Sequence, residues 1–291
     1  MKSGFVNIIG NPNVGKSTLM NALVGQRLSI ITSKAQTTRH RIFGILNGDN
    51  HQIVFSDTPG VIIPSYSLQE KMMGFVNASF EDADVLLYVV EAGEKTLKDG
   101  KILDRIRNHS APLIIALNKI DAISQQELEE YNQYWIAEFP NAEIIPISAL
   151  KNFQTEYLLQ RLIELVPEAP PYFDKETLTD RSERFFASEI IREKILIQYD
   201  KEVPYSCEVG IDTFKDEGHR IHIRAIIYVA RDSQKGIIIG HKGQSLSNLG
   251  RHSRKELDAF FGKPTFLELF VKVNKDWRQN ERQLKNFGYN S

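Results

Sequence analysis

The stretch Gly10-Asn11-Pro12-Asn13-Val14-Gly15-Lys16-Ser17 follows an apolar run, Phe5 to Ile9, and precedes an apparent helix from Thr18 to Leu23. Two glycines let a backbone wrap closely around phosphate oxygens, so that its N–H groups and the N-terminus of the next helix face the anion. Lys16 supplies a mobile cation, and the Ser17 hydroxyl suits a Mg²⁺ that bridges the outer phosphates. The order strand, loop, helix therefore predicts a phosphate site, with these candidates: Gly10, Asn11, Asn13, Val14, Gly15, Lys16, Ser17, Thr18. The alternative is a Gly-rich turn that binds nothing.

The length of 291 residues exceeds one typical domain and favours two. Hydrophobic residues make up 42% of the chain and charged residues 25%, which is ordinary for globular domains with buried cores. The longest apolar stretch, Val85 to Val90, is far shorter than the roughly 20 residues of a membrane helix. No signal-peptide core follows Met1, and the single cysteine, Cys207, fits a reducing compartment, so we expect a cytoplasmic protein.

The net charge of −1 conceals an asymmetry between the two parts of the chain. Residues 181–291 hold 20 Lys and Arg against 15 Asp and Glu, whereas residues 1–180 hold 16 against 22. The segment from Arg220 to Lys263 is the most basic, with 9 basic and 3 acidic residues. Such a bias often means only a solvated face, but it also suits a nucleic-acid partner.

Apolar strands alternate with helix-like stretches over the first half of the chain. Arg41 to Leu46 and His51 to Phe55, joined by Asn47 to Asn50, predict a hairpin after a long loop from Ser29 to Arg41. The further expected elements are Val85 to Val90, Leu97 to Arg107, Leu113 to Leu117, Gln126 to Phe139, Ile144 to Ile147 and Phe153 to Leu165. This alternation predicts an α/β domain over residues 1–168, with a mostly parallel sheet, one antiparallel edge hairpin, and ligands at the carboxyl ends of the strands.

Asp57-Thr58-Pro59-Gly60 stands at the end of an expected strand. The Asp57 carboxylate can hold Mg²⁺, usually through water, and the Gly60 amide can contact a terminal phosphate. Thr58 joins these two as a candidate nucleotide contact. Alone, this tetrapeptide is a weak turn signal.

Asn118-Lys119-Ile120-Asp121 follows the strand Leu113 to Leu117, and Ser148-Ala149-Leu150 follows the strand Ile144 to Ile147. The Asp121 carboxylate can accept from both N1–H and the exocyclic amine of guanine, a pair that adenine lacks. Asn118 can bind the other edge of the base, Lys119 can lie along its face, and amides of the second motif can reach guanine O6. The base predicted for the phosphate site is guanine.

These four motifs, in this order, resemble those of the P-loop GTPases. Within that class, the sequences of the segments Gly10 to Ser17, Ala35 to Arg39 and Asp57 to Val61 resemble the Era and MnmE branch. The resemblance implies GTP hydrolysis to GDP with Mg²⁺ held by Ser17, Asp57 and one threonine of a first switch, Thr38 more than Thr37. It also implies a second switch at residues 58–67, and it assigns Lys16, Thr38, Gly60 and Asn13 to catalysis.

Val61 occupies the place where related GTPases carry a glutamine that orients the attacking water. An isopropyl group cannot hydrogen-bond water, so intrinsic hydrolysis should be slow. In similar GTPases an asparagine at the place of Asn13 helps to hold K⁺ against the phosphates, which suggests K⁺-stimulated hydrolysis. The alternative is that Asn13 only shapes the loop.

Prolines at 167, 170 and 171 predict a semi-rigid linker, residues 169–180, before a second domain at residues 181–291. The expected order there is a helix from Glu183 to Gln198, strands around Tyr205 to Ile211 and Ile221 to Ile227, a short helix from Ser233, a helix from Gln244 to Phe261 and a strand from Phe266 to Val273. The segment from Asn274 to Phe287 is expected to be a helix that packs down through Trp277 and Leu284.

Gly240-His241-Lys242-Gly243 lies between the two expected helices of the basic segment and resembles the GXXG loop of a type II KH domain, a smaller α+β fold. Its glycines let a sugar-phosphate backbone come close, and the next helix N-terminus, His241 and Lys242 favour phosphate. Arg224 and Lys235 are further expected RNA contacts. Whether Ile237 to Ile239 and Leu246 form cleft walls or core stays open, and a GXXG alone is more often a turn.

A GTPase domain followed by a type II KH domain resembles the Era family of ribosome-assembly GTPases over essentially the whole chain. The resemblance implies a monomer that binds small-subunit ribosomal RNA near its 3′ end and the small ribosomal subunit, and that associates peripherally with the inner membrane. Two rivals remain: a P-loop kinase or ATPase, and a signalling GTPase whose second domain binds a protein or a membrane.

Overall fold

The computed structural model describes residues 1–290 and divides the chain into two compact units. The first comprises Met1–Ser65 and Gln69–Asp180, and the second comprises Tyr66–Leu68 and Arg181–Asn290. Among these residues, no helix combines the length and apolar character needed to span a bilayer.

A six-stranded sheet forms the centre of the first unit, in the order β2-β3-β1-β4-β5-β6. The strands are β1 (Lys2–Ile9), β2 (Ile42–Asn47), β3 (His51–Asp57), β4 (Val85–Glu91), β5 (Leu113–Asn118) and β6 (Glu143–Pro146). Only β2 is antiparallel to its neighbour, which confirms the edge hairpin. A parallel sheet covered on both faces needs strands that are apolar throughout, and β4 is buried along its first six residues.

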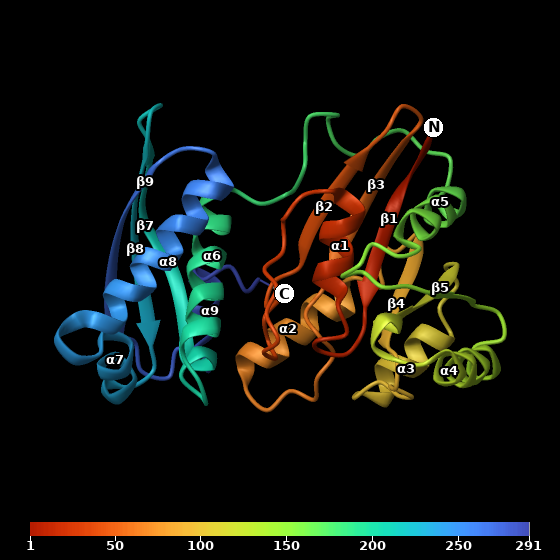
Figure 1. Ribbon diagram of the computed structural model, residues 1–291, viewed down its shortest axis with the longest axis horizontal. Helices are drawn as coiled ribbons and strands as arrows, with labels where there is room; N and C mark the ends of the chain where they lie inside the picture. The colour runs from red at the N-terminus through yellow and green to blue at the C-terminus, as the bar shows by residue number, and fades with distance from the viewer. Residues whose placement is uncertain (291) are drawn as a thin grey trace. The chain divides into compact units, whose positions relative to one another are not determined.

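Helices of the first unit are α1 (Lys16–Val24), α3 (Gly100–Arg107), α4 (Gln125–Glu138) and α5 (Thr155–Leu165), and α2 (Ser67–Ala78) spans the division between the units. Figure 1 shows α1 beside the hairpin end of the sheet, with α3 and α4 near β5. Helix α4 holds its place through Trp135, whose ring meets Tyr88 of β4 edge-on at 5.5 Å. The Asp99 side chain accepts from Lys101 N–H, which starts α3 at Gly100 instead of at the predicted Leu97.

The α2 helix was not predicted from the sequence. Its buried residues Leu68, Met72 and Val76 are spaced by four, the repeat of one helix face. This spacing is present in the sequence, but it begins directly after residues 58–67, where the family resemblance implies a second switch.

The expected linker, residues 169–180, is hydrogen-bonded along the edge of the first unit. Ile45 N–H of β2 donates to Leu178 O at 2.9 Å, and Phe43 N–H donates to the Asp180 carboxylate at 3.0 Å. The Gln52 side chain donates to Phe173 O and accepts from the Phe173 amide. This segment therefore protects the edge of the sheet, instead of merely spanning a gap.

A three-stranded sheet, β7-β8-β9, forms the second unit with helices α6, α7 and α8. The elements are α6 (Glu183–Gln198), β7 (Cys207–Asp216), β8 (Ile221–Val229), α7 (Asp232–Ile239), α8 (Gln244–Phe261), β9 (Thr265–Val273) and α9 (Glu281–Asn286). Figure 1 shows α6 and α8 over one face of this sheet, and their apolar residues share a core with β8. Cys207 belongs to that core and is fully buried, so its side chain contributes to packing.

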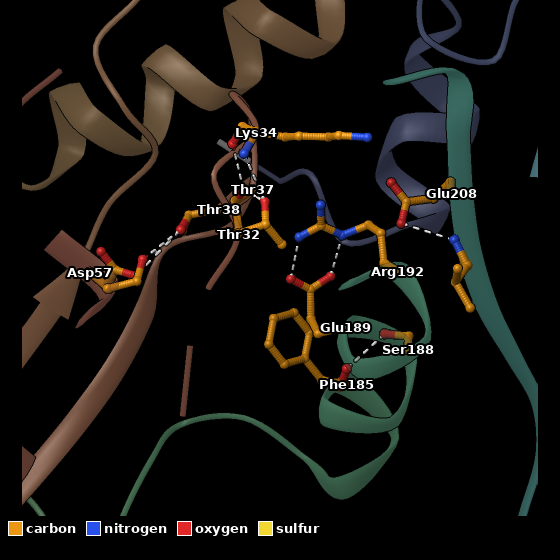
Figure 2. A network of polar contacts seen from close by, with 12 residues as sticks. Thr32, Lys34, Thr37, Thr38, Asp57, Phe185, Ser188, Glu189, Arg192 and Glu208 are labelled. Carbon is orange, nitrogen blue, oxygen red and sulfur yellow. Dashed lines mark hydrogen bonds and ion pairs between the residues drawn. The ribbon is translucent and has the colours of Figure 1, made fainter. Parts of the chain in front are cut away.

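The buried polar groups of α6 are paired. Arg192 donates to both carboxylate oxygens of Glu189, at 2.7 and 2.5 Å (Figure 2). Breaking such a pair would leave an uncompensated buried charge.

The predicted helix from Asn274 to Phe287 was wrong in extent, because only Glu281–Asn286 is helical. The Asn280 side chain accepts from Gln283 N–H and caps a new helix there, and Asp276 has a left-handed φ of 55° that interrupts any earlier turn. Trp277 and Leu284 are nevertheless fully buried, as expected. Trp277 Nε1 donates to Ser206 O at 3.0 Å.

Candidate nucleotide site and nucleic-acid groove

The loop from Gly10 to Ser17 joins β1 to α1. Gly15 has φ 99°, and a Cβ there would lie 2.3 Å from Asn118 Nδ2, so only glycine fits. Lys16 Nζ donates to Gly10 O and Asn11 O at 3.1 and 2.8 Å. Burial lowers the pKa of Lys16 to about 8, although Asp57 and Glu94 oppose this shift. Phosphate oxygens beside this ammonium would favour its charged form.

A cavity of about 760 Å³ opens at this loop. The predicted candidates that line it are Asn13, Gly15, Lys16, Ser17, Thr18, Thr37, Thr38, Gly60, Asn118, Lys119, Asp121, Ala149 and Leu150. The remaining candidates are absent from the lining: Gly10, Asn11, Val14, Asp57, Thr58 and Ser148. The four motifs thus come together at the carboxyl edge of the sheet, as predicted.

Three oxygen-bearing side chains converge at the phosphate end of the cavity. Ser17 Oγ donates to Asp57 Oδ2 at 2.7 Å, and Thr38 Oγ1 lies 2.9 Å from Ser17 Oγ and 3.5 Å from the same carboxylate oxygen. Asp57 is fully buried, its Oδ1 has no hydrogen-bond partner within residues 1–290, and burial raises its pKa. A hard divalent cation would offset that cost, so these residues fit Mg²⁺.

Thr37 points elsewhere. Its hydroxyl donates to Lys34 O at 2.6 Å and lies 2.6 Å from Thr32 Oγ1, whereas Thr38 faces Asp57 (Figure 2). Of the two threonines, Thr38 therefore has the geometry of a cation ligand. Within residues 1–290, no group of three or more His, Cys, Asp or Glu side chains could bind a metal by itself, so phosphate oxygens would complete the coordination.

Asn11 fastens the phosphate loop to residues 94–98, a role that the sequence did not reveal. Its Nδ2 donates to the Glu94 carboxylate and to Thr96 O, and its Oδ1 accepts from Lys98 N–H at 2.9 Å. Asn11 is only 3% exposed. It supports the loop from the protein side and does not line the cavity.

The segment after Asp57 is also attached to the phosphate loop. Val61 N–H donates to Gly10 O at 3.0 Å, and a Cβ on Gly60 would lie 2.6 Å from Pro12 Cα. Thr58 donates to Ile8 O at 2.7 Å and is fully buried, so its hydroxyl is already used within the protein. Val61 is fully buried as well and presents no group to water.

Asp121 and Ser148 form the base end of the cavity. Ser148 Oγ donates to Asp121 Oδ1 at 2.6 Å and so orients this exposed carboxylate. Asn118 Nδ2 donates to Val14 O and its Oδ1 accepts from Ala149 N–H, which ties the phosphate loop to the base loop. Ser148 N–H donates to Phe153 O, so two of the three amides predicted for guanine O6 already have partners in the protein. Lys119, in the left-handed region, pairs with Glu91.

Asn13 lies at the exposed rim of the phosphate end. Its φ is 67°, and its Nδ2 donates to Ser33 O at 2.9 Å. The amide oxygen of this side chain is the group that could face a monovalent cation.

A second hollow, a groove of about 530 Å³, lies between α8 and β9 of the second unit. Its lining consists of Gly243, Leu246, Ser247, Gly250, Arg251, Arg254, Phe266, Leu267 and Leu269. The loop Gly240–Gly243 stands at its head, with φ 72° and 78° at the two glycines, and a Cβ on Gly240 would meet Ser245 Cβ at 2.5 Å. His241 and Lys242 are exposed beside it. The apolar side chains of Leu246, Phe266, Leu267 and Leu269 beside two arginines suit a nucleic-acid strand.

Several groove residues differ from those expected. Arg224 and Lys235 do not line the groove, whereas Arg251 and Arg254 do, at the helical spacing of three. That spacing within the basic segment was the available signal. The sequence left open whether Leu246 and Ile238 form the cleft wall or the core. In the structure Leu246 lines the groove, whereas Ile238 is fully buried in the core.

Comparison with known proteins addresses the identity of both units. A family model described as "50S ribosome-binding GTPase" matches residues 5–119, and one described as "KH domain" matches residues 202–278. GTPase Era of Syntrophus aciditrophicus is 47% identical over 292 residues, which covers 99% of this chain and 95% of that protein. The chain belongs to the Era family of GTPases.

Further members of the Era family agree with this assignment. GTPase Era of Geotalea uraniireducens is 43% identical over an alignment that covers 99% of this chain and 98% of that protein. Two solved Era structures, each 38% identical and covering 99% of both chains with a TM-score of 0.93, are a variant of the Aquifex aeolicus protein bound to GDP and AlF₄⁻ and an Era bound to MgGDPNP and nucleotides 1506–1542 of 16S ribosomal RNA.

Membership of the Era family confirms the resemblance and the fold predicted from the sequence, a P-loop GTPase unit followed by a KH domain. The chain is a GTPase, so the alternative of a P-loop kinase or ATPase is rejected. The solved Era structures hold MgGDPNP or GDP with AlF₄⁻. In this chain Ser17, Thr38 and Asp57 meet at one end of the cavity, and Asp121 lies at the other.

Proposed function

We propose that this GTPase is a switch that binds the 3′ region of small-subunit ribosomal RNA in its KH groove and takes part in assembly of the small ribosomal subunit. The observation that carries the proposal is the groove itself, in which Arg251, Arg254 and the Gly240–Gly243 loop surround an apolar floor. The Era complex with 16S ribosomal RNA, which resembles this chain at 38% identity, supports the choice of RNA.

The family model for the first unit names the 50S ribosome, whereas the RNA in the Era complex belongs to the small subunit. We favour the small subunit because the family model covers only residues 5–119 and so does not include the groove. The full-length relative includes both units.

The proposed hydrolytic mechanism uses residues of the first unit. Lys16 and the loop amides would bind the outer phosphates, and Gly60 N–H would sense the terminal one. Ser17, Thr38 and Asp57 would hold Mg²⁺, which neutralises charge on the phosphates when bound. Because Val61 is buried and cannot orient water, we expect slow intrinsic hydrolysis.

Asn13 is the proposed ligand of a K⁺ that takes the place of an arginine finger. Its side chain lies at the phosphate end, where its Nδ2 donates to Ser33 O of the 29–41 loop, and its amide oxygen is the candidate ligand. Oxygen ligands of this kind suit a hard monovalent cation. If Asn13 only shapes the loop, its removal will change stability but not the response to K⁺.

Ribosomal RNA as the partner implies action in the cytoplasm. Peripheral contact with the inner membrane, implied by the family resemblance, is tested by co-sedimentation with vesicles that contain anionic lipid. A monomer is the expected state.

RNA binding by wild type and by Lys242→Glu, measured with a GTP analogue at matched salt, tests the groove. Lys275→Glu makes the same charge change at an exposed site that lies neither in the Gly240–Gly243 loop nor in the groove lining, and is the control. We expect at least a tenfold greater loss for Lys242→Glu, because a phosphate contact is replaced by repulsion. Equal affinities for the two variants would contradict the proposal, and recovery of a protein or membrane partner without RNA would favour a signalling GTPase.

A further inference from the structure

The sheet of the second unit has one face that its helices do not cover. Along β8, the core residues Ile223, Ala225 and Ile227 face the helices, so His222, Arg224, Ile226 and Tyr228 face the other way. Along β9, Leu267, Leu269 and Val271 face the core. The outer residues of β9 are therefore Phe266, Glu268, Phe270 and Lys272.

The C-terminal segment covers one end of this outer face. The ring of Phe287 lies 5.1 Å from that of Tyr228, and Tyr289 OH donates to Glu208 Oε2 at 2.6 Å. At the other end two large aromatic side chains stay exposed, Phe266 at 54% and Phe270 at 45%. An exposed apolar patch rimmed by polar residues marks an interaction site.

Arg224 and His222 of β8 lie against these rings. The Arg224 guanidinium lies 5.6 Å from the centre of the Phe270 ring, and the His222 ring meets Phe266 edge-on at 4.9 Å. Glu268, between the two phenylalanines in sequence, accepts from His222 at 2.9 Å and pairs with Arg224 at 3.5 Å, which fixes both of these side chains. Aromatic faces beside arginine are the usual platform for unstacked bases of single-stranded nucleic acid.

The same surface is continuous with the proposed RNA groove. Phe266 lines the groove and also stands on the outer face, and β9 is the edge strand between the two. Four residues of extended chain separate Phe266 from Phe270, or roughly 13 Å. A strand that leaves the groove across β9 would meet Phe266 first and Phe270 next.

We propose that this outer face, His222, Arg224, Phe266 and Phe270, is a stacking platform for bases of a single-stranded RNA segment that continues out of the groove. The inference rests on the proposed function, because the same RNA occupies both surfaces. It assigns binding roles to Arg224, which is outside the groove, and to two phenylalanines. The contact is independent of base identity, since every base has a face that stacks.

Binding measured with two lengths of single-stranded RNA distinguishes the contribution of the platform from that of the groove. A strand of about four nucleotides fills only a KH groove, whereas one of about twelve reaches further. We expect Phe270→Ala to weaken binding of the longer strand roughly tenfold, the loss of one stacked base, and to leave the shorter strand unaffected. Phe270→Trp should retain binding of the longer strand, because indole also stacks. Tyr157→Ala removes a side chain that is 51% exposed in the first unit and serves as the control.

The outcomes are distinct. Equal affinity of wild type and Phe270→Ala for the longer strand, with the shorter strand still bound, overturns the platform and leaves the groove intact. Failure of wild type to bind either strand overturns the groove and the platform together. A concentration-dependent dimer of the RNA-free chain that Phe270→Ala dissociates assigns the face to a second copy and overturns the platform. Photocrosslinking of the longer strand to the peptide that contains Phe270 supports it.

Discussion

At the scale of single residues, the nucleotide cavity separates side chains that face a ligand from side chains that hold those in place. Asp121 and Thr38 line the cavity, whereas Asn11 and Thr58 lie outside its lining and use their polar atoms within the protein. Substitutions in the two groups should therefore affect different properties, nucleotide affinity in the first group and stability in the second.

Asp121→Asn should weaken GDP binding at least about hundredfold, because two hydrogen bonds to a charged acceptor are lost and an amide donor faces the guanine N–H groups. Equilibrium titration with a fluorescent GDP analogue measures this. Ser148→Ala, which removes only the hydroxyl that orients Asp121, should have a smaller effect. A larger loss for Ser148→Ala would contradict a direct role of Asp121.

Asn11→Ala should lower the free energy of unfolding of the first unit by about 1–3 kcal/mol, because a buried amide that contacts Glu94, Thr96 and Lys98 is removed. Urea denaturation monitored by tryptophan fluorescence in a Trp277→Phe background reports on this unit through the buried Trp135. Asn141→Ala, at an exposed turn, is the control. No difference between the two variants would mean that Asn11 does not fasten the loop.

At the scale of elements, the segment 169–180 is expected to be a spacer but is hydrogen-bonded to the sheet of the first unit. Its prolines indicated a spacer, but a buried glutamine of β3, Gln52, binds its backbone from both sides. The sequence contains no local signal for this, since the partners lie some 120 positions apart.

Gln52→Ala should release this segment from the sheet edge. We expect faster amide hydrogen exchange at residues 172–178 by about tenfold, because several buried hydrogen bonds are lost together. Gln126→Ala on the exposed face of α4 should leave exchange there unchanged. Unchanged exchange in both variants would show that the prolines alone fix this segment.

Much of the fold was predictable because its strands and helices have strong periodicity and clear ends. The helices at Glu183–Gln198 and Gln244–Phe261 match the prediction at both ends, as Ser182 caps the first and Gly243 precedes the second. What local patterns could not give were contacts between distant positions, such as Ser148 with Asp121 and Tyr289 with Glu208. Arg251 and Arg254 were missed because a charge on a helix shows its role only when the neighbouring strand is known.

At the scale of the whole molecule, the proposal joins hydrolysis in one unit to RNA binding in the other. Hydrolysis should be faster in KCl than in NaCl, by tenfold or more, if K⁺ supplies the charge that an arginine finger supplies elsewhere. Phosphate release at saturating GTP measures it. Asn13→Ala should abolish the difference while retaining GDP affinity, and equal wild-type rates in the two salts would contradict a K⁺ site.

RNA affinity in the GTP-analogue, GDP and nucleotide-free states is the most direct measurement of the switch. We predict about fivefold or greater tightening with the GTP analogue relative to GDP, and by linkage the same RNA should tighten binding of the analogue by the same factor relative to GDP. Both should be measured with one RNA at one salt concentration, since RNA affinity falls steeply with salt. The same RNA affinity in all three states would contradict the central claim that the bound nucleotide controls RNA binding.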